Sequence, residues 1–216
     1  MSKRSHEIWN SGDTDVIDTR SKSLGNMRIV CAFTASLFMT SIGASAMAEE
    51  HSEREARIVN GELKVPFSSH NFSARCYDTL KCEVIYGRRY AAKFDKPSPP
   101  LTEAIRRSLD GSWGGIANFP PAARVSWVAK DGTPLEANVD VGEIFEDQYI
   151  LYGPELDVSD VALDRHFPDP GIILVVDNRT ISVYMRAMVF LRHPIVPSNP
   201  YSDMRHDVVL AFTRNF

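Results

Sequence analysis

The chain has 216 residues, 44% of them hydrophobic, and its 24 Lys and Arg against 28 Asp and Glu give a formal net charge of −4. This balance argues against a general nucleic-acid binder, because that class normally presents a basic surface. The sequence contains no internal repeat, no low-complexity tract and only one long uncharged run.

The uncharged run spans residues 29–48 and follows directly after Arg28. A basic flank, a short apolar core and the ending Ala46-Met47-Ala48 match a secretory signal with an A-x-A cleavage site. We place this signal at residues 27–48, with cleavage after Ala48. The alternative is an uncleaved inner-membrane anchor through residues 29–48, since a bilayer core needs about 20 mostly apolar residues. Several Ser, Thr and Gly residues dilute the run and favour cleavage. We therefore expect a periplasmic protein without a stable membrane span.

Residues 1–26 differ from the usual start of a secretory signal, because they mix acidic and basic residues without apolar periodicity. We interpret them as a non-structural leader, which is either a disordered cytoplasmic segment or an over-long gene prediction with the true start at Met27. On both interpretations residues 49–216 form a single β-rich domain, long enough for a proper hydrophobic core.

Two cysteines remain after the predicted cleavage, Cys76 and Cys82, and they lie close together in the sequence. In an oxidising compartment an even pair at this spacing predicts one disulfide that closes a small loop. A redox or metal-binding pair is the alternative, but that is more typical of C-x-x-C spacing or of additional ligands.

Residues 81–90 predict a strand that leaves the disulfide loop. Residues 98–109 predict a helix preceded by prolines, because apolar residues recur there at four-residue spacing: Leu101, Ile105 and Leu109. A second short helix is predicted over residues 158–166, with Asp157 as its N-cap.

Two hairpins are predicted in the second half of the chain. Residues 123–130 alternate apolar and polar side chains, turn at Asp131-Gly132 and return as residues 135–141. Residues 172–176 turn at Asp177-Asn178 and return as residues 180–192. Alternate residues of the returning strand would line one face: Ile181, Val183, Met185, Ala187, Val189 and Leu191. A last strand is predicted over residues 207–212.

The returning strand is also apolar on much of its opposite face, through Tyr184, Met188 and Phe190. Two-sided apolarity is typical of a central strand in a sandwich or in a helix-covered sheet. The expected fold is mainly β (α+β), an antiparallel β-sandwich or curved sheet with one or two short helices.

Local motifs for catalysis are missing from the sequence. It has no G-x-S-x-G elbow, no Gly-rich phosphate loop and no H-E-x-x-H zinc helix. We therefore expect no catalytic residue, no metal site and no cofactor. Glu143 and Asp147 could be drawn as an acid–base pair with apolar neighbours, but solvated loop acids are the favoured interpretation.

Charge is segregated along the chain. Between residues 133 and 177 there are many acidic residues and a single basic one, Arg165. If these acids collect on one surface, they would attract a protein partner with a basic surface. The alternative is that they only solubilise long connections. The predicted partner-binding residues are Glu143, Glu146, Asp147, Glu155, Asp157 and Asp160.

Two stretches carry a resemblance to known proteins. Residues 112–141 combine a WGG turn, a double proline, a V-x-W strand and a DG turn, and residues 171–185 form a late apolar hairpin. Together they are similar to several families of exported Gram-negative proteins of unknown function. Some members of those families are found beside secreted phospholipase-type toxins and resemble immunity proteins that protect the producer in its own periplasm. Those relatives often carry a lipoprotein cysteine, which this chain lacks at the expected place.

The resemblance implies an exported binding protein without catalytic activity, an immunity-type inhibitor of a secreted toxin. Two alternatives remain at this point. One is an envelope hydrolase that uses carboxylates from separate strands. The other is a structural or assembly factor of the cell envelope.

Overall fold

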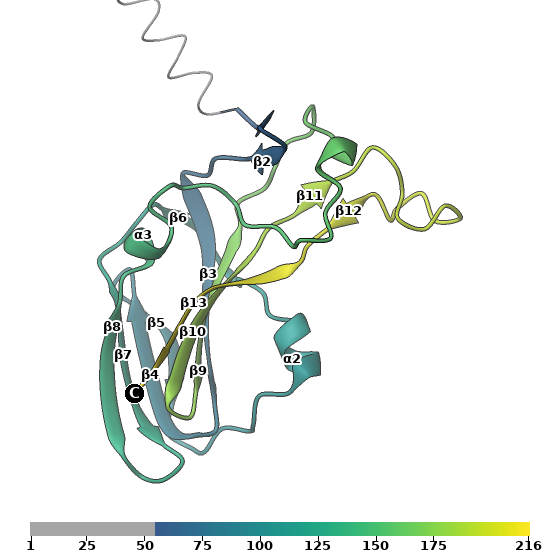
Figure 1. Cartoon of the computed structure of the whole chain (residues 1–216). Helices are drawn as coiled ribbons and strands as arrows, with labels where there is room; N and C mark the ends of the chain where they lie inside the picture. Colours follow the sequence, from purple (N-terminus) through teal and green to yellow (C-terminus); the bar gives the residue numbers. More distant parts are fainter. Residues whose placement is uncertain (1–54) are drawn as a thin grey trace, which may run out of the picture. The chain divides into compact units, whose positions relative to one another are not determined.

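A computed structural model describes residues 55–216 and shows a mainly β fold with short helices (Figure 1). The predicted leader, residues 1–26, and the predicted signal, residues 27–48, lie outside the described residues. Within residues 55–216, no helix is both long enough and apolar enough to cross a membrane.

The larger sheet has five strands in the order β13-β10-β9-β3-β6. Their bounds are β3 Ser69–Tyr77, β6 Trp113–Ala117, β9 Gly171–Asp177, β10 Thr180–Arg186 and β13 Val208–Asn215. Neighbouring strands are antiparallel except β3 and β9, which are parallel. A parallel pair needs a long crossover connection, and here the whole smaller sheet lies between these two strands in the sequence. The hairpin predicted over residues 172–192 is present as β9 and β10, but the returning strand is shorter than predicted, because β10 ends at Arg186 and Val189–Phe190 form a separate strand, β11.

The smaller sheet has four antiparallel strands in the order β5-β4-β7-β8. Their bounds are β4 Thr79–Tyr86, β5 Arg89–Phe94, β7 Ala123–Ala129 and β8 Pro134–Val139. The hairpin predicted over residues 123–141 is β7 and β8. The strand predicted over residues 81–90 is confirmed as far as Tyr86, in β4, but its end is wrong, because the chain reverses at Gly87 and Arg88, both at positive φ. Hairpin turns with positive φ are usually signalled by Asn-Gly or Asp-Gly. The Gly87-Arg88 sequence lacks this signal, and arginine rarely adopts positive φ, so the turn was not predicted.

The two sheets pack face to face around one hydrophobic core. Alternate residues of β4 and β7, such as Val84 and Trp127, meet alternate residues of β9 and β10, such as Leu174 and Val183. The predicted inward face of residues 180–192 is confirmed: Ile181, Val183, Met185, Ala187 and Val189 are buried, and Leu191 packs against the same cluster. A shift of one residue would turn this whole set to the opposite face, so the pattern specifies the register.

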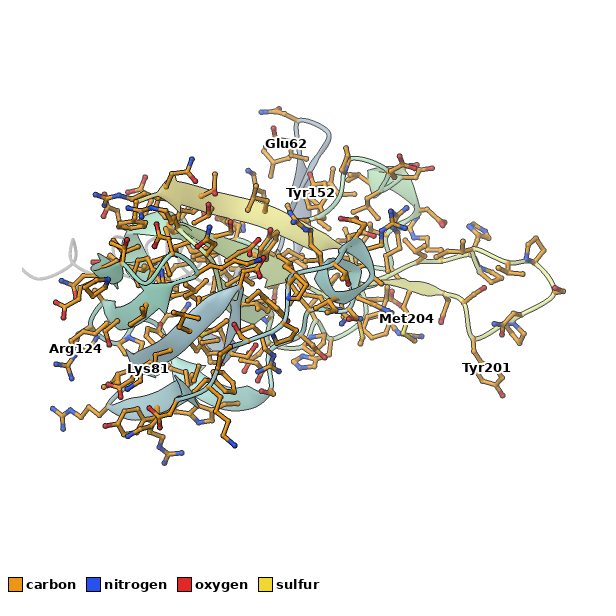
Figure 2. All side chains as sticks on the ribbon, turned by 90° about the horizontal axis from the view of Figure 1, so that it is seen from below. Glu62, Lys81, Arg124, Tyr152, Tyr201 and Met204 are labelled. Carbon is orange, nitrogen blue, oxygen red and sulfur yellow. A yellow bond between two sulfur atoms is a disulfide. The ribbon has the colours of Figure 1, made fainter. Side chains whose placement is uncertain are left out.

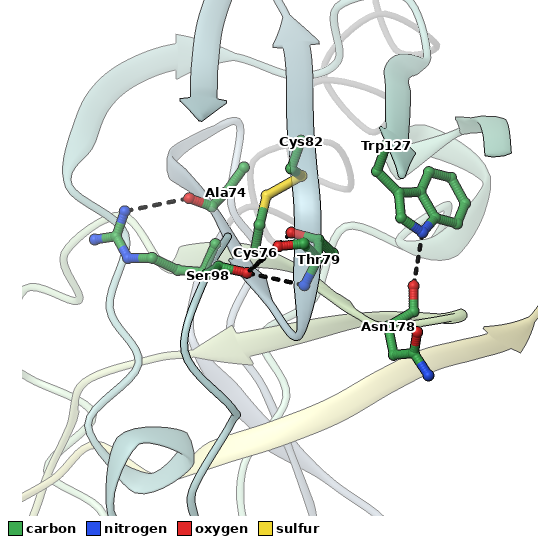
Figure 3. Close-up of a disulfide and its surroundings, with 8 residues drawn as sticks. Ala74, Cys76, Thr79, Cys82, Ser98, Trp127 and Asn178 are labelled. Carbon is green, nitrogen blue, oxygen red and sulfur yellow. Dashed lines mark hydrogen bonds between the residues drawn. A yellow bond between two sulfur atoms is a disulfide. The ribbon is translucent and has the colours of Figure 1, made fainter. Parts of the chain in front are cut away.

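A tight corner at Asp78 carries the chain from β3 in one sheet to β4 in the other. The predicted disulfide joins Cys76 and Cys82 on either side of this corner, with an S–S distance of 2.04 Å (Figure 3). Both cysteines belong to the core between the sheets. The bridge therefore links the two sheets covalently at one end of the core.

Helix α2, Glu103–Arg107, covers the outer face of the larger sheet. Apolar residues of the α2 region contact side chains of β3, β9 and β10 in a second cluster: Leu101, Ile105, Leu109, Tyr77, Ile173, Val175 and Tyr184. This cluster explains why β9 is buried on both faces. The helix is shorter than the predicted span of residues 98–109, because it begins only after the prolines, at the N-cap Thr102, whose side chain accepts from the N–H of Ile105.

Two further helical segments differ from the sequence prediction. Helix α3, Val141–Ile144, was not predicted, and the strand predicted over residues 135–141 ends two residues earlier, at Val139. Asp140 caps α3 by accepting from the N–H groups of Gly142 and Glu143. The helix predicted over residues 158–166 is only the single 3-10 turn η1, Val158–Asp160, with Asp157 as its N-cap. It ends there because Val161 forms a bridge with Leu191 instead.

Two small hairpins complete the described fold. Strands β1, Arg57–Val59, and β2, Glu62–Lys64, pair with each other. Strands β11, Val189–Phe190, and β12, Met204–Arg205, pair beyond the end of β10. The last strand, predicted over residues 207–212, is β13 and runs three residues further.

Candidate partner-binding site

The six acidic residues predicted to bind a partner separate into two groups. Glu143, Glu146 and Asp147 lie in α3 and the turn after it. Glu155, Asp157 and Asp160 lie before and within η1. Within each group the acidic residues are neighbours because they lie in the same short segment of the chain.

One member of the first group, Asp147, lies near a basic side chain, Lys64. The Asp147 carboxylate accepts from the N–H of Tyr149 at 3.3 Å. The Lys64 ammonium lies over the Tyr149 ring, 5.5 Å from its centroid. A hydrogen bond to Glu62 and, less strongly, the charge of Asp147 raise the pKa of Lys64. Of the first group, Asp147 is therefore the residue whose charge interacts with β2.

The second group lies at the base of a projecting segment, residues 192–203, which we call the arm. The Asp160 carboxylate is 2.5 Å from Nδ1 of His193, and its backbone carbonyl accepts from the N–H of Arg192 at 2.7 Å. The guanidinium of Arg205 donates to the backbone carbonyl of Glu155 at 2.8 Å. These contacts attach the start of the arm, and strand β12 directly after its end, to the acidic segment.

The arm extends beyond the β11–β12 pair, and Tyr201 lies near its end (Figure 2). Three large apolar side chains of the arm are exposed to solvent: Ile195 (56%), Val196 (48%) and Tyr201 (85%). A lone exposed apolar residue is ordinary on a protein surface. Three of them on one short projection, with Tyr among them, have the composition of a binding epitope.

Internal hydrogen bonds hold the arm in one conformation. The N–H of Ile195 donates to the carbonyl of Ser202 at 2.8 Å, and the N–H of Val196 donates to the Ser202 hydroxyl at 2.8 Å. The N–H of Asn199 donates to the carbonyl of Val196 at 2.8 Å. Prolines restrict the backbone further at positions 194, 197 and 200. A segment that is already ordered loses less conformational entropy when it binds.

Two of the acidic residues near η1, Asp157 and Asp160, already have partners within the protein. Hydrogen bonds from the hydroxyl and N–H of Ser159 lower the pKa of Asp157, which caps η1. Asp160 is engaged by His193. The Glu155 side chain has no ion pair with a residue of the described chain and is exposed. Of this group, Glu155 is therefore the side chain best placed to meet a basic partner.

Sequence reasoning missed the arm as a functional element. Residues 192–203 lie between two strands, and their exposed Ile, Val and Tyr alternate with prolines. Proline spacing next to large apolar residues is the signal that could have identified them, because it prevents these residues from joining a sheet.

Glu143 and Asp147, the candidate acid–base pair, are both exposed. Two other carboxylates instead share a hollow, Glu83 and Glu136, on the outer face of the four-stranded sheet. This hollow has a volume of about 570 Å³ and is also lined by Arg124 and Asn138. Nothing in the sequence indicates this hollow, because its residues come from four strands, β4, β7, β8 and β13.

His70 lies in a buried polar network. Its Nδ1 is 2.7 Å from Oδ1 of Asn118, and its Nε2 is 3.1 Å from the hydroxyl of Tyr86. The amide nitrogen of Asn118 donates to the carbonyl of Phe67, so its oxygen faces His70 as an acceptor. His70 therefore donates through Nδ1 and accepts from Tyr86 through Nε2. Burial lowers the pKa of His70 and raises that of Tyr86, which keeps both groups neutral.

Within residues 55–216, no three His, Cys, Asp or Glu side chains converge in a way that could hold a metal ion. A scan against protein-family models finds no match to this chain, and searches of curated proteins and of solved structures find none either.

Proposed function

We propose that this chain is an exported binding protein without catalytic activity, which uses the arm to occupy a cleft of another protein. The observation that carries this proposal is the exposure of Ile195, Val196 and Tyr201 on a hydrogen-bonded projection. Binding energy concentrates in a few apolar and aromatic side chains that enter a pocket, and the arm presents such a group.

The partner would have an apolar cleft with a basic rim. The apolar residues of the arm would fill the cleft, and the exposed carboxylate of Glu155 at the base would meet a basic residue outside it. Rim charges of this kind mainly increase the association rate. An immunity-type inhibitor of a secreted toxin fits this description, since covering a toxin's active-site cleft is enough to neutralise it. The resemblance of residues 112–141 and 171–185 to such proteins supports the same role.

Export is part of the proposal and can be tested directly. Osmotic shock of cells that express the full chain should release a protein whose intact mass begins at residue 49. Its two cysteines should resist alkylation until a reductant is added, because the Cys76–Cys82 bridge forms in an oxidising compartment. A full-length chain in the cytosol with both thiols free would refute export.

The arm can be tested in the producing cells. A photo-crosslinking amino acid at position 201 should trap one discrete protein, and the same group at position 90 serves as the control. Tyr90 is also an exposed tyrosine, 57% exposed, but lies in β5. Crosslinking of the same protein from both positions, or of none from position 201, would contradict the proposal.

Kinetics with the trapped partner then separate apolar and charge contributions. Tyr201→Ala should raise the dissociation rate by about tenfold or more, as expected for a buried aromatic anchor. Glu155→Lys should lower the association rate and flatten its salt dependence. The paired change Glu143→Lys with Glu146→Lys is the matched control on the first acidic group. If only this control slows association, the surface around α3 is the binding site and the arm is not.

A second candidate, an envelope hydrolase, is favoured by one observation. Glu83 and Glu136 line the same hollow and lie in register on β4 and β8, with β7 between them. Strands two apart are separated by about 10 Å, near the spacing of about 6.5–9.5 Å between the carboxyl groups of inverting glycosidases. Release of new reducing ends from purified cell-wall glycan, lost in both Glu83→Gln and Glu136→Gln, would establish it. No release would exclude glycan hydrolysis.

A further inference from the structure

The outer face of the four-stranded sheet carries two parallel rows of side chains. Strand register places one residue of each of β5, β4, β7 and β8 in each row. The first row is Lys93, Glu83, Ser126 and Glu136, and the second is Tyr90, Ile85, Arg124 and Asn138. Figure 2 shows Arg124, with Lys81 near it, on the opposite side of the view from Tyr201. This face is therefore separate from the arm.

All residues of the two rows except Tyr90 line a continuous depression, and Tyr90 lies beside it. The hollow of about 570 Å³ adjoins a second one of about 260 Å³, and the two share Glu83, Ser126 and Glu136. Arg214 of β13 borders the larger hollow. We call this combined depression the trough. Its length across four strands suits an extended ligand better than a compact one.

Lys93 and Glu83 of the trough pair with each other at 3.9 Å, and four other polar side chains there are free. Within residues 55–216, Arg124, Ser126, Glu136 and Asn138 have no hydrogen bond or ion pair with another side chain. Arginine only donates, an ionised glutamate only accepts, and Ser and Asn do both. The trough therefore offers interleaved donors and acceptors at its surface.

Charge in the larger hollow is balanced. Arg124 and Arg214 stand against Glu83 and Glu136, so the hollow selects for a ligand without net charge. A small zwitterion would satisfy the same balance, but Arg124 and Glu136 are exposed, and exposed ion pairs contribute little affinity. An extended neutral ligand with many hydroxyl groups can use all of these groups at once.

Apolar surface lies next to the polar groups. Ile85 lines the larger hollow. Tyr90 follows it in the same row, at the border of the trough, with 57% of its surface exposed and the Lys93 ammonium 4.6 Å from its ring centroid. Sugar rings combine hydroxyl edges, which bond to planar polar side chains, with C–H faces, which pack on aromatic rings. The row of Tyr90, Ile85, Arg124 and Asn138 presents both kinds of surface side by side.

We propose that the trough binds a neutral oligosaccharide, with Arg124, Ser126, Glu136 and Asn138 as hydrogen-bonding partners and Tyr90, at the border of the trough, as the stacking surface. This inference does not rest on the arm or on the identity of its protein partner. Binding of a glycan in the trough would hold the protein on a glycan surface and leave the arm free to contact its protein partner.

The test uses the mature chain, residues 49–216, labelled with ¹⁵N. It is titrated with two neutral hexasaccharides, N-acetylchitohexaose and maltohexaose, and affinity is measured by calorimetry. At least one should bind and shift amide signals of β4, β7 and β8. The first sugar represents an amino-sugar polymer of the cell wall and the second a glucan, so the stronger binder identifies the glycan source.

Variants decide whether the trough is the site. Arg124→Ala combined with Asn138→Ala should weaken binding about tenfold or more, since two hydrogen-bonding side chains are lost. The matched control, Arg165→Ala with Asn199→Ala, removes the same residue types near and on the arm and should leave affinity unchanged, as should Tyr201→Ala. Circular dichroism confirms that each variant is folded.

Three outcomes would overturn the proposal. They are no binding of either hexasaccharide at millimolar concentration, binding that shifts signals of the arm rather than the sheet, and binding of the zwitterion glycylglycine without binding of a hexasaccharide. Loss of partner crosslinking at position 201 with sugar binding intact would count only against the arm.

Discussion

The indole Nε1 of Trp127 donates a hydrogen bond to the backbone carbonyl of Asn178 at 2.6 Å (Figure 3). Trp127 lies in β7 of the smaller sheet, and Asn178 forms the turn between β9 and β10 of the larger sheet. The ring of Phe216 packs edge-on against the same indole, with ring centroids 5.3 Å apart. One side chain thus connects both sheets and the C-terminus.

Trp127→Phe should lower the free energy of unfolding by about 2–4 kcal/mol, because the buried ring becomes smaller and the Asn178 carbonyl loses its donor. Urea unfolding followed by circular dichroism measures the change. Trp113→Phe is the control, since Trp113 is only partly buried and its indole N–H has no hydrogen bond within residues 55–216. Equal losses in the two variants would show that ring volume, and not the link to Asn178, sets the cost.

Loss of the disulfide should destabilise the protein moderately. The bridge closes a loop of seven residues, with a sequence separation of 6, and chain entropy for so short a loop gives about 2–2.5 kcal/mol. The double variant Cys76→Ala with Cys82→Ala and the reduced wild type should unfold at similarly lower urea concentrations. A reductant that leaves the unfolding midpoint of the wild type unchanged would contradict this expectation.

Stability should decrease as the pH falls below about 6.5. Burial lowers the pKa of His70 from its ordinary 6.5, against smaller opposing effects of Asn118 and Asp169. Between that lowered pKa and 6.5 the unfolded chain binds a proton that the folded protein does not bind. The free energy of unfolding therefore falls through this window by about 1.4 kcal/mol for each unit of lowering, and this loss is complete once the pH is below the folded pKa.

Urea unfolding at pH 7.5, 6.5 and 5.5 measures the His70 effect. His70→Gln should be less stable at pH 7.5 and should lose the pH dependence in this window. His166→Gln, which changes an exposed histidine, should retain it. A wild-type stability that stays flat between pH 7.5 and 5.5 would show that His70 titrates normally in the folded protein.

The α2 cluster should contribute as a small second core. Leu109 is 3% exposed and packs under α2 against the larger sheet, so Leu109→Ala should cost about 2–4 kcal/mol. Leu80→Ala changes an exposed leucine of β4 and should cost less than about 0.5 kcal/mol. If both variants unfold at the wild-type urea concentration, α2 does not stabilise the sheet.

Local sequence predicted the elements whose signals lie within a few residues. Asp131-Gly132 identified the β7–β8 turn, and alternation in residues 180–192 identified the inward face of β10. The β4–β5 turn was missed because Gly87 and Arg88 adopt positive φ without the usual turn sequence. Helix α3 was missed because four residues are too few to show helical periodicity.

Periodicity and cysteine spacing were enough to predict the mainly β class, the inward face of β10 and the Cys76–Cys82 disulfide, because these signals act over short distances along the chain. The parallel pairing of β3 with β9, the division of the six acids into two groups and the assembly of the trough depend on the folded chain. Each of these joins residues from separate strands or loops, and which strands become neighbours depends on how the two sheets bury their apolar faces together.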